Sequence, residues 1–129
     1  MRATTFHEYV QQVSAIVSQA VANDHAVLLN LQIDQRSTLR GRIEGQLQYV
    51  NGSELHFKEF VDLTLDDPKA AYAYHYQDAD NGLIFRYDNA THRPTVGAPH
   101  HKHTATGTEP STSPDLLQIV DEISRGARS

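Results

Sequence analysis

The segment YAYHYQDADNGLIFRYDN, residues 72–89, indicates a β-hairpin and is the best-defined element of the fold. Tyrosines alternate with smaller or polar residues up to Gln77, and alternation of apolar and polar residues resumes at Leu83. This period of two is typical of half-buried strands. The intervening Asn81-Gly82 pair is a strong signal for a tight hairpin turn. We therefore predict two antiparallel strands, over residues 70–77 and 83–89.

The turn also predicts which side chains share a face of this hairpin. Strand alternation puts His75 on the face opposite its two neighbouring tyrosines. If the loop has an even number of residues, as an Asn-Gly turn favours, His75 lies on the same face as Arg86 and Asp88. An odd loop would break this arrangement. The other face would then carry the aromatic residues Tyr74, Tyr76, Phe85 and Tyr87.

The remainder of the chain predicts two helices and three more strands. Apolar residues recur at helical spacing over 6–21, after a capping box at residues 5–8, and again over 116–123. Ser113 is the expected N-cap of the second helix, and Gly126 its expected end. Alternating patterns predict strands over 27–33, 39–49 and 54–63, with Asn51-Gly52 as a second hairpin turn.

These elements predict an α+β fold: a five-stranded antiparallel meander sheet with an N-terminal and a C-terminal helix, in the order α-β-β-β-β-β-α. Short connections favour antiparallel neighbours and leave both helices to cover one face. At 129 residues, we expect residues 1–129 to form a single domain. Residues 91–113 are rich in Pro, Gly, Thr and Ser, which predicts a long loop, and we expect residues 104–113 to be mobile.

Two irregularities interrupt the strand patterns. Gly41 and Gly45 occupy the inward face of the second strand, which predicts a bend or a close approach of the first helix. Glu59 interrupts the apolar face of the third strand, and Phe60 interrupts its polar face. The third strand is therefore expected to be bulged or partly buried on both sides.

Charge and composition exclude several classes of protein. The net charge of −5, from 11 basic and 16 acidic residues, argues against a general nucleic-acid coat but leaves room for a local site. The chain has no cysteine, which excludes disulfides and thiolate metal sites. We find neither a secretory signal nor an apolar run as long as a membrane span. We therefore expect a cytoplasmic protein without membrane contact.

Titratable residues are concentrated from Tyr72 to His103, which holds five of the eight histidines. Two interpretations are open for His75, Arg86 and Asp88: a solvated cross-strand ion pair, or a reactive site. The His100–His103 run can be a polar loop, a pair of metal ligands or a source of proton donors and acceptors. No cysteine or His-Glu-x-x-His pattern completes a metal site, so we predict neither a metal nor a cofactor.

Two imidazoles and a cation are the groups that cleavage of RNA requires. One imidazole activates the 2′-hydroxyl, the other protonates the leaving oxygen, and the cation binds the phosphate. Tyrosines more often pack in cores than stack on bases, so both roles are open for them. The predicted catalytic residues are His75, Arg86, Asp88, His101 and His103. The predicted substrate-binding residues are Tyr76, Tyr87, His92, His100 and Lys102.

From about Leu39 to the C-terminal helix, the chain resembles the TumE family of prokaryotic toxins. The matching motifs are Leu55-His56-Phe57-Lys58-Glu59-Phe60-Val61, Tyr74-His75-Tyr76-Gln77, Ile84-Phe85-Arg86-Tyr87-Asp88-Asn89-Ala90 and Pro99-His100-His101-Lys102-His103. The chain departs from the family pattern at residues 91–93, where Pro-His-His is expected and only His92 carries over. It also has Ala98 in place of an expected aromatic residue.

The resemblance implies a small cytoplasmic toxin, encoded beside a DNA-binding antitoxin protein that binds and silences it. Our hypothesis is a toxin of a toxin–antitoxin pair that acts on RNA by histidine acid–base catalysis, as a ribonuclease-like hydrolase or phosphotransferase. The alternative is a non-catalytic interaction module whose sheet and His-rich loop dock a partner protein. Catalysis requires His75 and a second histidine, His101 or His103, to flank one phosphate. Dispersed or hydrogen-bonded histidines would favour the interaction module.

Overall fold

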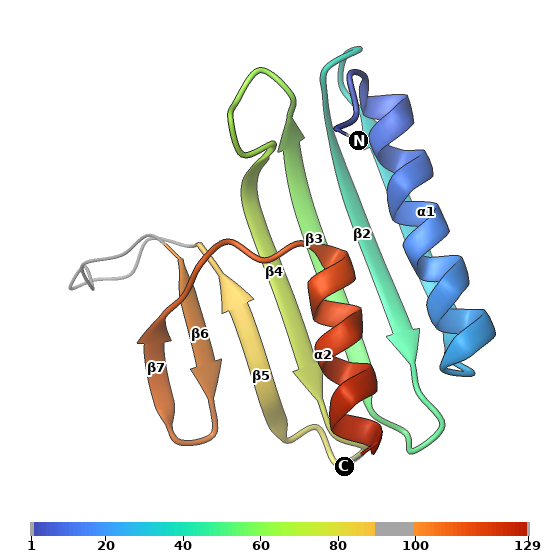
Figure 1. Cartoon of the computed structure of the whole chain (residues 1–129), viewed down its shortest axis with the longest axis vertical. Coiled ribbons are helices and arrows are strands. Elements are labelled where there is room, and N and C mark those ends of the chain that lie inside the picture. Colours follow the sequence, from blue (N-terminus) through green and yellow to red (C-terminus); the bar gives the residue numbers. More distant parts are fainter. Residues whose placement is uncertain (1, 90–99, 129) are drawn as a thin grey trace.

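The computed structural model of the protein describes residues 2–89 and 100–128 (Figure 1). Its elements are α1 (Phe6–Asn23), β1 (Val27–Gln35), β2 (Arg40–Gln48), β3 (Glu54–Asp62), β4 (Lys69–Gln77), β5 (Leu83–Asp88), β6 (His101–Thr104), β7 (Gly107–Pro110) and α2 (Leu116–Arg128). The strands form one sheet in the order β1-β2-β3-β4-β5-β6-β7, with every neighbouring pair antiparallel. This is the meander that short connections favour.

Both helices lie on the same face of the sheet, as the sequence predicted (Figure 1). In that view α1 lies in front of β1 and β2, and α2 lies in front of β3 and β4. The apolar core fills the layer between the helices and the sheet. It includes Phe6 and Val17 from α1 and Ile119 from α2, together with the inward side chains of the strands. The predicted α+β class is therefore confirmed.

The predicted number of strands was wrong, because the described residues form seven strands and not five. The two additional strands, β6 and β7, come from residues predicted to be a loop. They form because β5 offers a free edge, where Asp88 pairs with His101 and Arg86 pairs with His103. Each is four residues long, too short and too polar to show alternation in the sequence. Residues 104–113 thus include all of β7, and their expected mobility stays a prediction.

The α2 helix begins two residues later than the Ser113 cap predicted. Asp115 caps it: its carboxylate accepts a hydrogen bond from the N–H of Gln118 at 2.9 Å. The Gln118 side chain in turn accepts from the N–H of Asp115, also at 2.9 Å. This reciprocal pair satisfies donors that the first helical turn leaves without partners. The helix also continues past Gly126, where we expected it to end.

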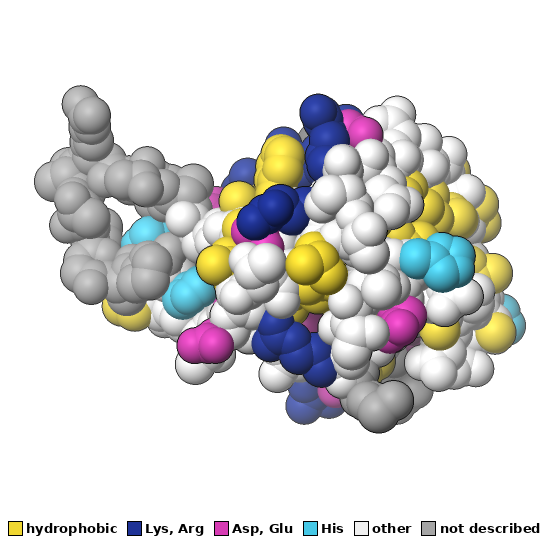
Figure 2. Space-filling view, turned by 90° about the horizontal axis from the view of Figure 1, so that it is seen from above, with side chains coloured by type: hydrophobic (Ala, Val, Ile, Leu, Met, Phe, Trp, Pro, Cys, Tyr) yellow, Lys and Arg dark blue, Asp and Glu magenta, His cyan; other side chains and the backbone are white. Residues whose placement is uncertain are grey.

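β1 is the long exposed edge of the sheet. A register shift between Leu28 and Asn30 interrupts the alternation that the sequence predicted for this strand. Its exposed apolar side chains are Val27, Leu28, Leu29 and Ile33. Figure 2 shows apolar side chains on the right flank of the molecule, where α1 and β1 lie. The opposite edge is the much shorter strand β7.

The close approach predicted at the inward glycines is confirmed at Gly41. A Cβ atom added to Gly41 would lie 2.3 Å from the ring of Phe6, the first residue of α1, which is fully buried. At Gly45 the same atom would lie 2.2 Å from the ring of Phe57 on β3. The two glycines therefore leave room for two aromatic rings, one from the helix and one from the next strand.

We expect Gly41→Ala to destabilise the protein by about 1–3 kcal/mol, because the added methyl overlaps a packed ring. Urea unfolding of both proteins measures this difference. Gly126→Ala is a matched control, because a Cβ there meets nothing within 4 Å and alanine favours a helix. Equal stability of Gly41→Ala and the parent would contradict the importance of this contact.

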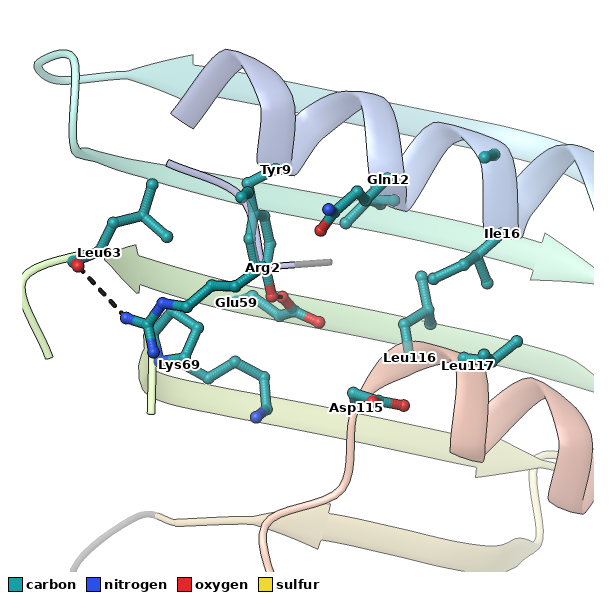
Figure 3. A pocket seen from close by; sticks show the side chains of 14 residues that line it. Arg2, Tyr9, Gln12, Ile16, Glu59, Leu63, Lys69, Asp115, Leu116 and Leu117 are labelled. Carbon is teal, nitrogen blue, oxygen red and sulfur yellow. Dashed lines mark hydrogen bonds between the residues drawn. The ribbon is translucent and has the colours of Figure 1, made fainter. Parts of the chain in front are cut away.

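Glu59 is a carboxylate within the core, only 1% exposed. The hydroxyls of Tyr9 on α1 and Tyr74 on β4 each donate a hydrogen bond to one of its oxygens. Figure 3 shows Glu59 beside a cavity of about 560 Å³ that lies between the helices, near Tyr9 and Lys69. Burial raises the pKa of Glu59, and the two tyrosine hydrogen bonds offset this only in part. Glu59, which interrupts the apolar pattern of β3 in the sequence, therefore links α1 to the sheet through buried hydrogen bonds.

We expect Glu59→Gln to gain stability relative to the parent as pH rises above about 4.5. The raised pKa means that the acid contributes stability below its unfolded value, and this contribution is lost at higher pH. Glutamine stays neutral and can keep both tyrosine contacts. Glu59→Leu would leave two buried hydroxyls without their acceptor and should cost roughly 1–3 kcal/mol for each. Urea unfolding from pH 4 to 8 tests both, and a pH-independent effect of Glu59→Gln would contradict this account.

Candidate functional site

The uncovered face of the sheet carries the histidines of β3, β4 and β6. We call it the open face; its side chains from β2 to β6 include Arg42, Glu44, Gln46, Glu54, His56, Lys58, Phe60, Ala71, Ala73, His75, Gln77, Ile84, Arg86, Asp88, His101 and His103. The strand register aligns one row across this face, in the order Gln46, His56, His75, Arg86 and His103. Directly paired side chains on one face are close neighbours.

The prediction that His75 shares a face with Arg86 and Asp88 is confirmed. His75 pairs with Arg86, and Ala73 pairs with Asp88, so the register is the one an even loop would produce. The expected even loop was wrong, because residues 78–82 form a connection of odd length. The register shift between Tyr76 and Gln77 compensates for it, so that His75 still pairs with Arg86. Imidazole, guanidinium and carboxylate groups therefore lie together on the open face.

The His75 ring lies beside that of His56 on β3, with ring centroids 6.2 Å apart and planes at 82°. The His75 Nε2 atom lies 3.1 Å from the side-chain oxygen of Gln77, an acceptor, which places the proton of a neutral ring on Nε2. The Nδ1 atom is buried and has no hydrogen-bond partner among the described residues. Burial, followed by the charges of Arg86 and His56, lowers the pKa of His75. His75 is therefore suited to act as a neutral proton acceptor.

His56 is held by a carboxylate. Its Nε2 atom lies 3.1 Å from Glu54, and the same Glu54 oxygen accepts a hydrogen bond from Gln46 at 2.7 Å. The hydrogen bonds from Gln46 and then His56 lower the pKa of Glu54, which keeps it ionised. The Glu54 carboxylate therefore orients the His56 ring. The two histidines thus have different environments on adjacent strands.

Arg86 is anchored at one end by Asp88. Its Nε atom donates to Asp88 at 2.9 Å, whereas its two Nη groups make no hydrogen bond to any residue in 2–89 or 100–128. His103 lies 3.4 Å from the same Asp88 oxygen. Burial raises the pKa of Asp88, but the Arg86 hydrogen bond and the His103 charge outweigh it, so its pKa is lowered. Asp88 is therefore ionised and keeps the guanidinium in place.

The other predicted site residues lie elsewhere. His101 is on the open face but buried, with its ring 6.2 Å from that of His103. Tyr76 and Tyr87 are buried on the helix-covered face, and His92 lies outside the described residues. Also on the helix-covered side are His100, 2.7 Å from the Tyr72 hydroxyl, and Lys102, 3.3 Å from Glu122. The structure therefore brings together His75, Arg86, Asp88 and His103, with the buried His101 paired beside Asp88 on the next strand.

His56 was not among the site residues predicted from the sequence. Alternation places it on the polar face of β3, and that signal was available. What was missing was the register between β3 and β4, which sets His56 opposite His75. A turn of uncertain length around Asp66–Lys69 left this pairing open. Lys58 and Phe60, on the same face of β3, were missed for the same reason.

Two hollows lie side by side on the open face. The first, about 360 Å³, is lined by Gln46, His56 and His75 among others, and the second, about 400 Å³, by Phe60, Ala71 and Asp88 among others. Both are also lined by Lys58, Ala73 and Arg86. We call the two together the open-face trough. Its middle carries Lys58 and Arg86, which pair with Glu44 at 4.0 Å and Asp88 at 2.9 Å. These two cations are the groups of the trough that suit a phosphate group.

Residues 2–89 and 100–128 contain no group of three or more His, Asp or Glu side chains placed to hold a metal ion. In the same residues, neither helix has the length and apolar character that a membrane crossing requires.

The fold and site define a small α+β protein with a helix-covered core and a histidine-bearing open sheet face. A family model described as Toxin TumE matches residues 17–127, and the chain therefore belongs to this toxin family. The resemblance seen in the sequence is thus confirmed, and membership of a toxin family supports an antitoxin as partner. No curated protein and no solved structure matches the chain significantly.

We expect the lowered pKa of His75 to make the fold less stable in mild acid. The unfolded chain binds the His75 proton at higher pH than the folded chain, so stability is lost as pH falls below about 6.5. His75→Gln removes the titrating group. The stability of this variant relative to the parent should therefore rise as pH falls from 7.5 to 5. Urea unfolding across that range measures the difference. His7→Gln on α1 is the control, and an identical pH dependence for His75→Gln and the parent would contradict the prediction.

Proposed function

We propose that the protein is a cytoplasmic toxin that cleaves RNA by acid–base catalysis on its open face, and that a DNA-binding antitoxin silences it. The observation that carries this proposal is the pair of imidazoles, His56 and His75, 6.2 Å apart and beside Arg86. From the sequence, the imidazole that acts together with His75 was expected to be that of His101 or His103. In the proposed site it comes from His56, because Arg86 lies between His75 and His103 in the row.

In the proposed reaction, side chains of the protein serve as both the proton acceptor and the proton donor. His75 accepts the proton of the 2′-hydroxyl, whose oxygen attacks the adjacent phosphorus. The accepting atom, Nδ1, is buried in the unbound protein, so this step requires the His75 ring to turn toward the open face when RNA binds. The bond from phosphorus to the 5′-oxygen breaks, and the protonated His56 ring donates its proton to that oxygen. The products are a 2′,3′-cyclic phosphate and a free 5′-hydroxyl. Proton transfer requires each ring to come within ~2.6–3.2 Å of its oxygen, and two adjacent rings can flank one phosphate.

Arg86 supplies the charge stabilisation. The two Nη groups can donate to the non-bridging oxygens of the phosphate, whose negative charge grows as the 2′-oxygen attacks. Asp88 and, through it, His103 act as positioning residues, since they hold the guanidinium at Nε. This local cation supports RNA binding by a protein whose total charge is −5. His101 is too buried to touch substrate in this scheme.

A non-catalytic interaction module is the second candidate. The criterion stated from the sequence favours it, because His56, His75 and His103 are hydrogen-bonded, to Glu54, Gln77 and Thr108. The open face exposes two large apolar side chains, Phe60 at 43% and Ile84 at 41%. Such residues on an otherwise polar sheet favour contact with another molecule. In this candidate function the open face docks a partner protein, and the histidines contribute hydrogen bonds without proton transfer.

The test is expression of the chain without its antitoxin, followed by growth and total RNA integrity, and assay of the purified protein on RNA. We expect growth arrest with RNA fragmentation, and a loss of roughly 10²- to 10⁴-fold in cleavage rate for His75→Gln and for His56→Gln. Arg86→Gln should also lose activity. His7→Gln is the surface control and should cleave normally.

Each alternative result has a definite meaning. Arrest without RNA loss would keep the toxin and discard the ribonuclease. Absence of arrest at good soluble expression would favour the interaction module. Cleavage unaffected by His56→Gln and His75→Gln would overturn the assignment of these residues, because neither ring would then transfer a proton.

A further inference from the structure

Phe60 is an aromatic side chain on the open face that the proposed chemistry does not use. It points away from the helices, is 43% exposed, and pairs with Arg42 on β2 and Ala71 on β4. The register of β3 and β4 shifts directly after it, between Phe60 and Val61. Such irregularities redirect side chains and are frequent beside binding sites. Phe60 is not part of the hydrophobic core, so its ring is available for contact with another molecule.

The hollow beside Phe60 has the form of a slot. Ala71 and Ala73 on β4 form a floor of small side chains, and longer side chains rise on both sides. One wall is Phe60 and Lys58 from β3, and the other is Arg86 and Asp88 from β5. The β5 wall is held in place by the hydrogen bond that Arg86 Nε donates to Asp88 at 2.9 Å. The slot has a volume of about 400 Å³, an apolar floor and an aromatic side.

Asn89 lines one end of the slot. Its side-chain nitrogen donates to the carbonyl of Ala70 at 3.1 Å, and its oxygen accepts from the N–H of Tyr72 at 3.0 Å. These bonds tie the residue after β5 to β4. The slot therefore runs from Asn89 toward His56 and His75, and shares Lys58, Ala73 and Arg86 with the first hollow.

We infer that this slot binds one nucleobase of single-stranded RNA, stacked on Phe60, with its phosphate held between Lys58 and Arg86. This inference rests on the proposed function for the choice of RNA as ligand. Aromatic side chains on an open sheet are a common platform for unpaired bases. Lys58 and Arg86 lie between the slot and the histidines. This position suits an RNA strand, in which a negatively charged phosphate follows each base.

Strand geometry sets the distance between this base and the reacting phosphate. Ala71, Ala73 and His75 lie on one face of β4 at intervals of two residues, or roughly 7 Å each. A base above Ala71 and Ala73 therefore lies about one or two such intervals from His75. The base in the slot therefore neighbours the cleaved bond and does not itself react.

Stacking on Phe60 should increase affinity without selecting a particular sequence. Each base has a π-face, and no side chain around the slot is required to read its edge. We therefore expect Phe60→Ala to weaken binding of any short single strand to a similar degree. Phe60→Tyr should retain it, because the ring is kept.

The experiment measures binding of a fluorescent single-stranded RNA whose 2′-hydroxyls are methylated, so that it cannot be cleaved by attack of the 2′-oxygen. We expect Phe60→Ala to weaken binding by roughly 5- to 100-fold, the range for one stacked base. Phe60→Tyr should bind within a few-fold of the parent. Ile84→Ala, which removes the other large apolar side chain of this face, should bind like the parent. Thermal unfolding of each variant verifies that it is folded.

Equal affinity of Phe60→Ala and the parent would overturn the inference, as would equal losses in Phe60→Ala and Ile84→Ala. Absence of RNA binding by the parent, with a Phe60→Ala defect only in antitoxin binding, would overturn it in favour of a protein occupant. Cleavage and binding separate the two proposals. Binding that depends on Phe60 without any cleavage would support the slot and reject the ribonuclease. Cleavage by a Phe60→Ala variant with unchanged affinity would reject the slot alone.

Discussion

The antiparallel register of β3, β4 and β5 is the constraint on which the rest of the structure depends. It places His56, His75 and Arg86 in one row on the open face. Because side chains alternate, a slip of one residue would turn every side chain of a strand to the other face. His75 would then enter the core, and Tyr74 would enter solvent. Burial of the aromatic side chains against the helices thus indirectly fixes the position of the reactive groups.

The two faces of the sheet contain ionisable groups in contrasting environments. On the helix-covered face, Glu59 is buried and its pKa is raised, although two tyrosine hydroxyls donate to it. On the open face, Asp88 is also largely buried, yet Arg86 and His103 lower its pKa. The difference lies in the partners: neutral hydroxyls stabilise a carboxylate less than cations do. The first carboxylate links a helix to the sheet, and the second orients a guanidinium.

Much of this arrangement was predictable from alternation and turn chemistry. His75 was correctly placed with Arg86, although the loop is odd and a register shift, not the expected even Asn81-Gly82 turn, produces this pairing. The glycine at position 41 correctly indicated a close contact with the first helix. The same alternation placed Tyr76 and Tyr87 on the face opposite His75. They were nevertheless proposed as substrate-binding residues, because the sequence does not say which face the helices cover. The structure shows them buried under those helices.

The sequence by itself determined the helix and strand segments up to residue 89, the hairpin faces and the toxin family, since these depend on local periodicity, turn residues and motifs. Only the tertiary structure decided that His56 lies beside His75, that β6 and β7 extend the sheet, and that Phe60 borders a trough. These features depend on pairing between residues far apart in the chain. Such pairing is set by packing of the whole sheet, and short polar strands such as β6 form only against an edge already in place.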